Sequence, residues 1–282
     1  MNDDKLILAQ AEDRIEQCQN YDMLTHTGFL DARQQSLARR SFGVRQGDVQ
    51  LLYYGGYEDA DRVIMVCLPY YMSDAVNAES LSAPPAEDTG AAENAAAAPV
   101  RELLTVIRAT APKGSHASRS GRSLSHSDYL GALMGLGIKR TVVGDILVRE
   151  DGADIIVLSE IADYLMQTFA SAGRSHLSLA RLPIEALIVP AHETHEIHDT
   201  VASLRLDAVL AAAFRLPRGK AADAIRQGLV FVDHLEATKA DMPVEEGAEL
   251  VIRHKGKAIL SEVGGRSRKD RINVTFTKFG SR

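Results

Sequence analysis

Basic side chains gather at the start of two predicted helices in the last third of the chain. Arg205 precedes the first helix, and Arg218 with Lys220 opens the second. A helix start already carries partial positive charge, so cations there are mildly unfavourable for stability. Its backbone N–H groups, together with Arg and Lys, are well suited to bind phosphate. We therefore predict a phosphate site at these helix starts, unless nearby carboxylates engage the cations. The alternative is a solvated helix end with no ligand.

Further cations extend this pattern toward the C-terminus. Four of them fall within six residues at the tip of a predicted Gly-Gly hairpin, and others lie in a turn and at a helix end. Each one alone is more typical of a solvated surface than of a ligand contact. The full set of predicted contacts is Arg205, Arg218, Lys220, Arg226, Lys255, Lys257, Arg266, Arg268, Lys269 and Arg271.

The charge of the chain is divided unevenly. The net charge is −6, but the residues from Ser203 onward hold 15 Lys and Arg against 10 Asp and Glu, a net of +5. The preceding 202 residues therefore carry a net of −11. A basic segment on an acidic body localises the contact surface for a polyanion. On charge alone, nucleic-acid binding and a chance imbalance remain equally good interpretations.

A second polar cluster has the composition of a metal site but not its spacing. Its members are His192, Glu193, His195 and His198. The metalloprotease motif needs two His four residues apart on a helix, whereas the spacing here from the first His is three and six. Cys18 and Cys67 also lack a metal-binding spacing. We predict no metal ion and no disulfide framework.

Enzymatic chemistry finds little support in the motifs. Gly135-Leu136-Gly137 follows a predicted helix, whereas a nucleotide-binding glycine loop follows a strand. Asp207 invites comparison with the catalytic Asp of pseudouridine synthases, but it opens an apolar helix, and we interpret it as a structural cap. We predict a protein without catalytic residues or a cofactor. The alternative is an RNA-modifying enzyme with its active site in the first 180 residues.

The order of predicted elements gives an α+β fold in three parts. Helical spacing covers residues 4–18 and 31–40, and strands alternate with two helices between residues 63 and 180. The segment from 78 to 100 is rich in Ala, Pro and acids, and we predict that it is disordered. The predicted domains are residues 1–60, an α/β domain; 61–182, an α+β domain with the disordered insertion 78–100; and 183–282, the basic module.

The basic module resembles the S4 RNA-binding motif. In RLDAVLAAAFRLPRGKAADAIRQGLVFVD, the pattern is carried by Arg205-Leu206-Asp207, by Arg218 with Ala221, and by Ile225, Gly228, Val230 and Val232. The sequence departs from the motif at Pro217, where Ser is usual, and at two turns. The resemblance implies a C-terminal S4 (αL-type) module of two short helices and a small sheet. It also implies that Arg205, Arg218 and Lys220 contact RNA.

Nearly the whole chain resembles the YlmH family of bacterial S4 proteins. The resemblance is carried by FLDARQQ, YYGGYEDADR, LGALMGLGIKRTVVGDILV and GGRSRKDRINVTFTKF. It implies an RNA-recognition-like (RRM-like) middle domain and a role in the rescue of obstructed large ribosomal subunits. The implied partners are ribosomal RNA and tRNA on the 50S subunit, with quality-control or cell-division proteins. The alternative is a cell-division scaffold with secondary RNA binding.

The predicted middle strands contain no aromatic residue, whereas RNA-recognition domains stack bases on sheet aromatics. We therefore predict contact with folded RNA through shape and phosphate. No apolar stretch approaches the ~20 residues of a membrane span, and MNDDK is not followed by an apolar signal core. These features predict a cytoplasmic monomer without a membrane partner.

Overall fold

The structure is a computed structural model that describes residues 2–58, 60–73, 75–77, 80–81, 91–111, 124–189, 194–253 and 255–279. Two compact units make up the chain. One contains residues 1–34 and 41–190, and the other contains residues 35–40 and 191–282. Within the described residues, no helix is long and apolar enough to span a membrane.

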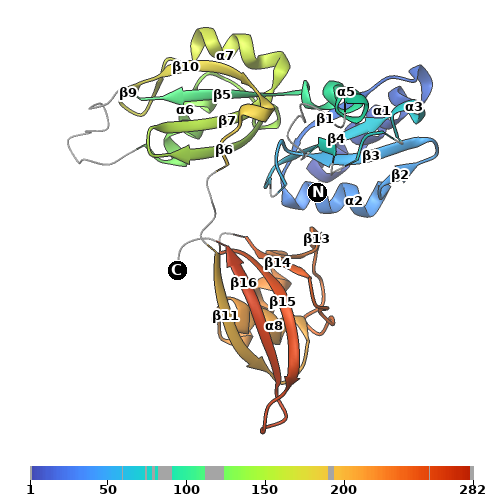
Figure 1. Cartoon of the computed structure of the whole chain (residues 1–282), viewed down its shortest axis with the longest axis vertical. Coiled ribbons are helices and arrows are strands. Elements are labelled where there is room, and N and C mark those ends of the chain that lie inside the picture. The colour runs from blue at the N-terminus through green and yellow to red at the C-terminus, as the bar shows by residue number, and fades with distance from the viewer. Residues whose placement is uncertain are drawn as a thin grey trace. The chain divides into compact units, whose positions relative to one another are not determined.

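The N-terminal part of the first unit is an antiparallel sheet with the strand order β1-β4-β3-β2 (Figure 1). Its strands are β1 (Thr25–Leu30), β2 (Arg45–Gln46), β3 (Val49–Tyr54) and β4 (Val63–Leu68). Its helices are α1 (Asn2–Tyr21) and α3 (Tyr70–Ser73). Helix α2 (Ala32–Phe42) follows β1 in the chain, and its residues 35–40 are grouped with the second unit. All six residues of β4 are buried, as its unbroken apolar sequence requires. Since β3 and β4 are paired, this sheet continues past the boundary that we predicted after residue 60.

Part of the predicted disordered insertion is instead helix α5 (Ala91–Arg101). Ala97 and Val100 on this helix are fully buried in a hydrophobic core. The prediction was wrong for these residues because composition cannot reveal that small alanine side chains meet a complementary surface. Residues 82–90 of the insertion lie outside the described residues.

The middle sheet has the strand order β10-β5-β7-β6, and all its pairings are antiparallel (Figure 1). In chain order this is 4-1-3-2, with a helix after the first and third strands, the ferredoxin-like arrangement that we predicted as RRM-like. The elements are β5 (Leu104–Thr110), α6 (His126–Gly135), β6 (Val143–Arg149), β7 (Gly152–Leu158), α7 (Ala162–Thr168) and β10 (Ser178–Pro183). The short strands β8 (Ser171–Ala172) and β9 (Ser175–His176) and the 3-10 helices η1 (Arg140–Val142), η2 (Ser159–Ile161) and η3 (Ile184–Ala186) connect them.

The two faces of the middle sheet are buried against different partners. Ile107 and Ile155 pack with Tyr129 and Leu133 of α6, and this core also includes residues of α7. On the opposite face, Val106 and Ile156 share one core with Phe29, Tyr54 and other side chains of the N-terminal sheet. The N-terminal and middle sheets therefore form a single hydrophobic unit.

The second unit is built on the strand order β11-β16-β15-β14-β12-β13 (Figure 1). Its strands are β11 (Thr194–Val201), β12 (Val230–Val232), β13 (Leu235–Glu236), β14 (Glu249–Ile252), β15 (Gly256–Arg266) and β16 (Ile272–Phe279). Its helices are α8 (Leu206–Ala213) and α9 (Arg218–Arg226). Both helices and the hairpins confirm the order of elements predicted from the sequence.

Candidate nucleic-acid interface

Helices α8 and α9 are held together by one apolar stripe on each. Leu206, Val209, Leu210 and Ala213 follow the i, i+3, i+4, i+7 spacing and are buried in the core of the second unit. Ala221 and Ile225 of α9 are buried in the same core. Burial of these stripes fixes the two helix starts, which is where the predicted cations lie.

Asp207 brings the two predicted arginines together. Its carboxylate accepts hydrogen bonds from Nε and Nη2 of Arg218 at 2.9 and 3.0 Å, and from the same atoms of Arg205 at 3.3 and 3.4 Å. Burial alone would raise the pKa of Asp207, but bonding to the two guanidinium groups outweighs it and lowers that pKa. The predicted role of Asp207 as a cap is therefore wrong: Arg205 is the N-cap of α8, and no side chain caps this helix start.

The start of α8 also differs from the expected phosphate site. The backbone N–H groups of Leu206 and Asp207 donate to the carbonyls of Met242 and Ala240 at 2.8 and 3.0 Å. These donors are occupied by the protein itself, so the expectation of unused N–H groups fails at this helix. At the start of α8, these two backbone N–H groups are therefore not available to a phosphate.

The Arg205–Asp207–Arg218 cluster carries a net charge of +1, since one carboxylate opposes two guanidinium groups. The Asp207 side chain is only 9% exposed, whereas those of Arg205 and Arg218 are 45% and 53% exposed. Lys220 is also exposed, in the first turn of α9. Asp207 engages both arginines, so the condition that we set against a phosphate site is met at Arg205 and Arg218, and their position at two helix starts no longer predicts such a site by itself. The net charge of +1 and the exposure of both guanidinium groups still give the cluster a cationic surface.

Of the other predicted RNA contacts, some side chains bond to neighbouring residues and others do not. Arg226 pairs with Asp223, Lys257 with Glu249 at 2.7 Å, and Arg266 with Asp270 at 2.7 Å. Arg271 donates to Thr200. In the described part of the chain, no ion pair engages the exposed residues Lys255, Arg268 and Lys269. The hairpin tip between β15 and β16 therefore presents two unpaired cations, not four.

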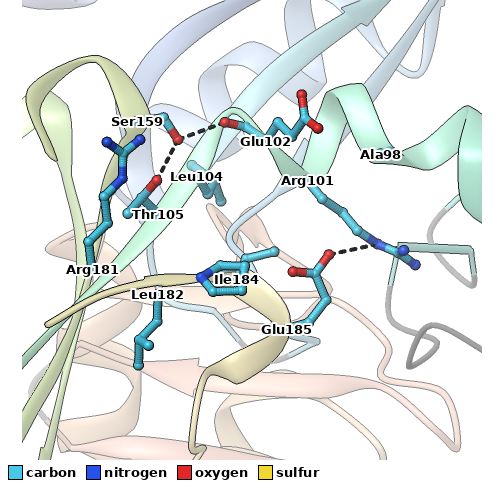
Figure 2. Close-up of a pocket in the computed structure, with 11 residues that line it drawn as sticks. Ala98, Arg101, Glu102, Leu104, Thr105, Ser159, Arg181, Leu182, Ile184 and Glu185 are labelled. Carbon is cyan, nitrogen blue, oxygen red and sulfur yellow. Dashed lines mark hydrogen bonds and ion pairs between the residues drawn. The ribbon is translucent and has the colours of Figure 1, made fainter.

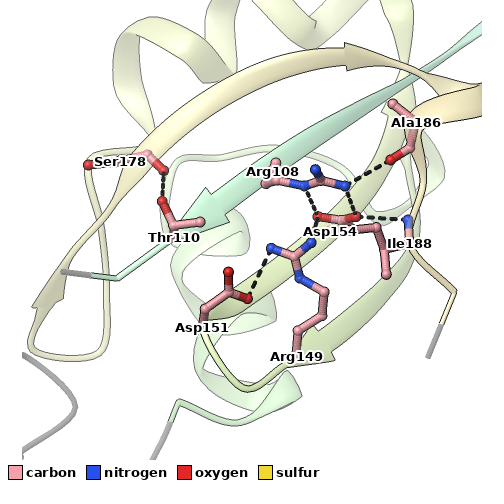
Figure 3. Close-up of polar contacts among 8 residues, drawn as sticks. All are labelled: Arg108, Thr110, Arg149, Asp151, Asp154, Ser178, Ala186 and Ile188. Atoms are coloured by element: carbon pink, nitrogen blue, oxygen red, sulfur yellow. Dashed lines mark hydrogen bonds and ion pairs between the residues drawn. The ribbon is translucent and has the colours of Figure 1, made fainter. Parts of the chain in front are cut away.

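On the middle sheet, the face opposite α6 and α7 carries a polar cluster where RNA-recognition domains place aromatics. Asp154, fully buried on β7, accepts two hydrogen bonds from Arg108 at 2.8 and 2.7 Å. It also pairs with Arg149 at 3.3 Å and accepts the N–H of Ile188 at 3.1 Å (Figure 3). Strands β5, β6, β7 and β10 contain no aromatic residue. This face offers no stacking platform for bases.

A pocket of about 640 Å³ lies where α5, β5 and β10 meet. The Ser159 hydroxyl bonds the Thr105 hydroxyl at 2.7 Å and the Glu102 carbonyl at 2.6 Å. On the other side of the pocket, Arg101 faces Glu185 (Figure 2). Its lining residues include no His or Cys. The Ser159 and Thr105 hydroxyls bond each other and a backbone carbonyl, and among the described residues no hydrogen bond joins either hydroxyl to the Glu102 or Glu185 carboxylate of the lining.

Two histidines of the polar cluster that we predicted not to bind a metal ion lie on β11. His195 is half-buried and His198 is exposed on this strand, and the His198 ring bonds the Thr275 hydroxyl at 3.2 Å. His192 and Glu193 lie outside the described residues. Among the residues that are described, no group of three or more His, Cys, Asp or Glu is placed to hold a metal ion.

Comparisons with known proteins agree with this geometry. A family model described as "S4 domain" matches residues 204–250, and one described as "Putative RNA-binding domain in YlmH" matches residues 118–186. The fold and the cationic helix pair thus define an RNA-binding protein of the S4-domain class.

The family follows from a curated relative. The "Ribosome-associated protein quality control protein P2" of Bacillus subtilis (strain 168) is 32% identical over 252 residues, which are 89% of this chain and 86% of the relative. The chain belongs to the YlmH family, as its sequence predicted. The solved structure of "Cell division protein ylmH from Streptococcus pneumoniae" is 18% identical with a TM-score of 0.41, covering 64% of this chain and 92% of that one.

Proposed function

We propose that this protein binds structured RNA of the large ribosomal subunit, together with tRNA held there, and assists the rescue of obstructed subunits without catalysing a reaction. The name of the Bacillus subtilis relative, which places that protein in ribosome-associated quality control, supports this proposal. A cytoplasmic monomer that meets quality-control or cell-division proteins on the ribosome is consistent with this role.

The observation that carries the proposal is the exposed cationic cluster of Arg205 and Arg218 around Asp207, with Lys220 beside it. Arginine binds phosphate through paired N–H groups and does so more strongly than neutral donors. Phosphate contacts position a protein on nucleic acid and supply most of its affinity. Folded RNA presents closely spaced phosphates, which suits a fixed pair of guanidinium groups.

The remaining cations would form secondary contacts. Arg268 and Lys269 at the hairpin tip reach solvent without an ion pair among the described residues, so we assign them a second phosphate contact. We place the cations that bond other residues, and Lys255, at the edge of the interface. There they would add positive charge without fixing how the RNA is oriented. These edge residues are Arg226, Lys255, Lys257, Arg266 and Arg271.

Replacement of Arg218 and Lys220 by Ala tests the site. We expect weaker binding to tRNA and ribosomal RNA and a smaller dependence on salt, because each phosphate contact contributes about −0.9 to the log–log salt slope on a duplex. Folding should persist, since both side chains are exposed. The matched control is Lys5→Ala with Arg45→Ala, which removes two exposed cations from the N-terminal part. A slope equal to that of the unmodified protein would show that the site lies elsewhere.

Sedimentation tests the ribosomal part separately. The full-length protein should move with 50S particles at low salt, more so after translation is stalled. Absence from the 50S fractions under both conditions would contradict ribosome binding, even if binding to isolated RNA were confirmed.

A further inference from the structure

We propose that Asp207 is a positioning residue that turns Arg205 and Arg218 into a receptor for a single phosphodiester group of RNA. This inference rests on the proposed RNA binding and adds a role for a residue whose own charge repels RNA. It assigns the geometry of the site to a buried carboxylate and the contact with RNA to the two arginines.

The hydrogen bonds determine which edge of each guanidinium group faces RNA. Asp207 uses Nε and Nη2 of both arginines, so its four acceptor positions are filled by four N–H groups. A guanidinium group has five N–H donors, and three remain on each arginine. The remaining donors include both hydrogens of Nη1. In this proposal the two free edges, which belong to guanidinium groups held by one carboxylate, together meet the oxygens of one phosphate.

Charge balance favours one phosphate. Two guanidinium groups and one carboxylate sum to +1, which one phosphodiester would neutralise. The sum stays at +1 when Asp241, whose charge acts on Arg205, and Lys220 are both included. Without Asp207 the two cations would repel each other, and each long side chain would sample many rotamers. The carboxylate therefore orders the arginines before RNA arrives, which lowers the entropy lost on binding.

The backbone around Asp207 is itself fixed. Its N–H bonds the carbonyl of Ala240, and Leu206 beside it is fully buried and bonds Met242. Arg205 forms a β-bridge with Pro243. On the other helix, Pro217 precedes Arg218 as the N-cap of α9. The carboxylate and both arginines thus start from constrained backbone positions, as a preorganised receptor requires.

The opposite interpretation is that Asp207 merely neutralises the arginines and weakens RNA binding. The two interpretations predict opposite signs for Asp207→Asn. If only charge matters, removal of a negative charge strengthens binding and steepens the salt dependence. If Asp207 positions the arginines, the Asn amide cannot accept four guanidinium N–H groups, so binding weakens although the domain becomes more positive.

The test measures the affinity of the full chain for labelled tRNA at several salt concentrations. We expect Asp207→Asn to weaken binding about tenfold and to reduce the salt slope by about one contact. The matched control is Asp223→Asn, which removes the same charge from the neighbouring helix, where Asp223 pairs with Arg226. It should bind as tightly as the unmodified protein or more tightly. Equal or tighter binding by Asp207→Asn would overturn the proposal.

A mutant cycle that combines Asp207→Asn with replacement of the two arginines separates a positioning role from general damage to the fold. In a chain that already carries Arg205→Ala and Arg218→Ala, Asp207→Asn should cause no further loss of affinity, only the gain expected from removal of a negative charge. A further loss there would mean that Asp207 acts through the fold and not through the arginines, and would also overturn the proposal.

A second variant covers the case in which Asp207→Asn does not fold. Asp207→Glu keeps the charge and moves the carboxylate by one methylene, so we expect weaker binding by threefold or more. Affinity equal to that of the unmodified protein would reject the positioning role. The variant with Arg218→Ala and Lys220→Ala distinguishes failure of the RNA site from failure of the positioning role. If this variant binds RNA normally, the RNA site itself is misplaced. If it binds weakly while Asp207→Asn binds tightly, only the positioning role fails.

Discussion

Replacement of Asp154 by Ala should destabilise the middle sheet by about 3–5 kcal/mol, the usual cost of leaving one member of a buried ion pair without its partner. Asp154 is fully buried and accepts hydrogen bonds from Arg108 and from the N–H of Ile188, and it pairs with Arg149. The variant would leave Arg108 without its carboxylate, whereas Arg149 would keep its pair with Asp151 at 3.1 Å.

The exposure of the two arginines adjusts this magnitude. The Arg108 side chain is 23% exposed and can turn partly toward water, whereas that of Arg149 is only 11% exposed. Arg108 also donates to the carbonyl of Ala186 at 2.8 Å, a bond that helps to hold the segment after β10 (Figure 3). Because Arg108 can turn toward water, we expect a loss of stability at the lower end of this range, about 3 kcal/mol.

Hydrogen–deuterium exchange of peptides from β5 and β7 measures this loss within the full chain. A loss of about 3 kcal/mol corresponds to roughly hundredfold faster exchange, since about 1.4 kcal/mol is a factor of ten. The matched control is Asp163→Ala, which removes a carboxylate from the exposed pair with Arg181. Exposed pairs contribute about 0–1 kcal/mol. If the Asp154 variant exchanged no faster than the Asp163 variant, the cluster would not stabilise this sheet.

Two further predictions concern the first unit. Burial, followed by the nearby charge of Asp61, raises the pKa of Asp145 to about 6. Since this folded-state pKa lies above the unfolded value, stability should fall by roughly 3 kcal/mol as the pH rises from about 4 through 6. Asp145→Asn should abolish this dependence in urea unfolding at each pH, and an unaltered pH profile would refute it. Ala97→Asp should destabilise the unit by about 3 kcal/mol or more because it buries an unpaired charge, whereas Ala95→Asp, on the exposed side of α5, should change thermal stability little. Equal effects of the two would mean that α5 does not pack on the core.

The two helices of the S4 domain could be predicted because their signals are local. The apolar stripe of α8 follows helical spacing, and Gly228 ends α9 with a positive φ of 67°, as glycine at this position usually does. Each signal depends on a few neighbouring residues and on the period of a helix. Local geometry therefore determined both the elements and the positions of Arg205 and Arg218.

The features that were missed depend on partners far away in sequence. Helix α5 is stabilised by a core that includes β3 and β5, which the composition of its own segment cannot show. The end of the first sheet was misplaced because β4 pairs with β1 and β3, and the sequence of β4 does not specify its neighbours. Sheet pairing and shared cores are non-local, so they appear only in the assembled fold.

The two buried aspartates explain why sequence alone could not define the candidate site. Asp154 and Asp207 each hold two arginines, and nothing in the residue types separates them. The arginines around Asp154 are largely buried, so that cluster stabilises a sheet. The arginines around Asp207 are about half exposed, so the same chemistry there leaves N–H donors in solvent. The exposure of the arginines, which the sequence does not reveal, is what makes the Asp207 cluster and not the Asp154 cluster the candidate for phosphate binding.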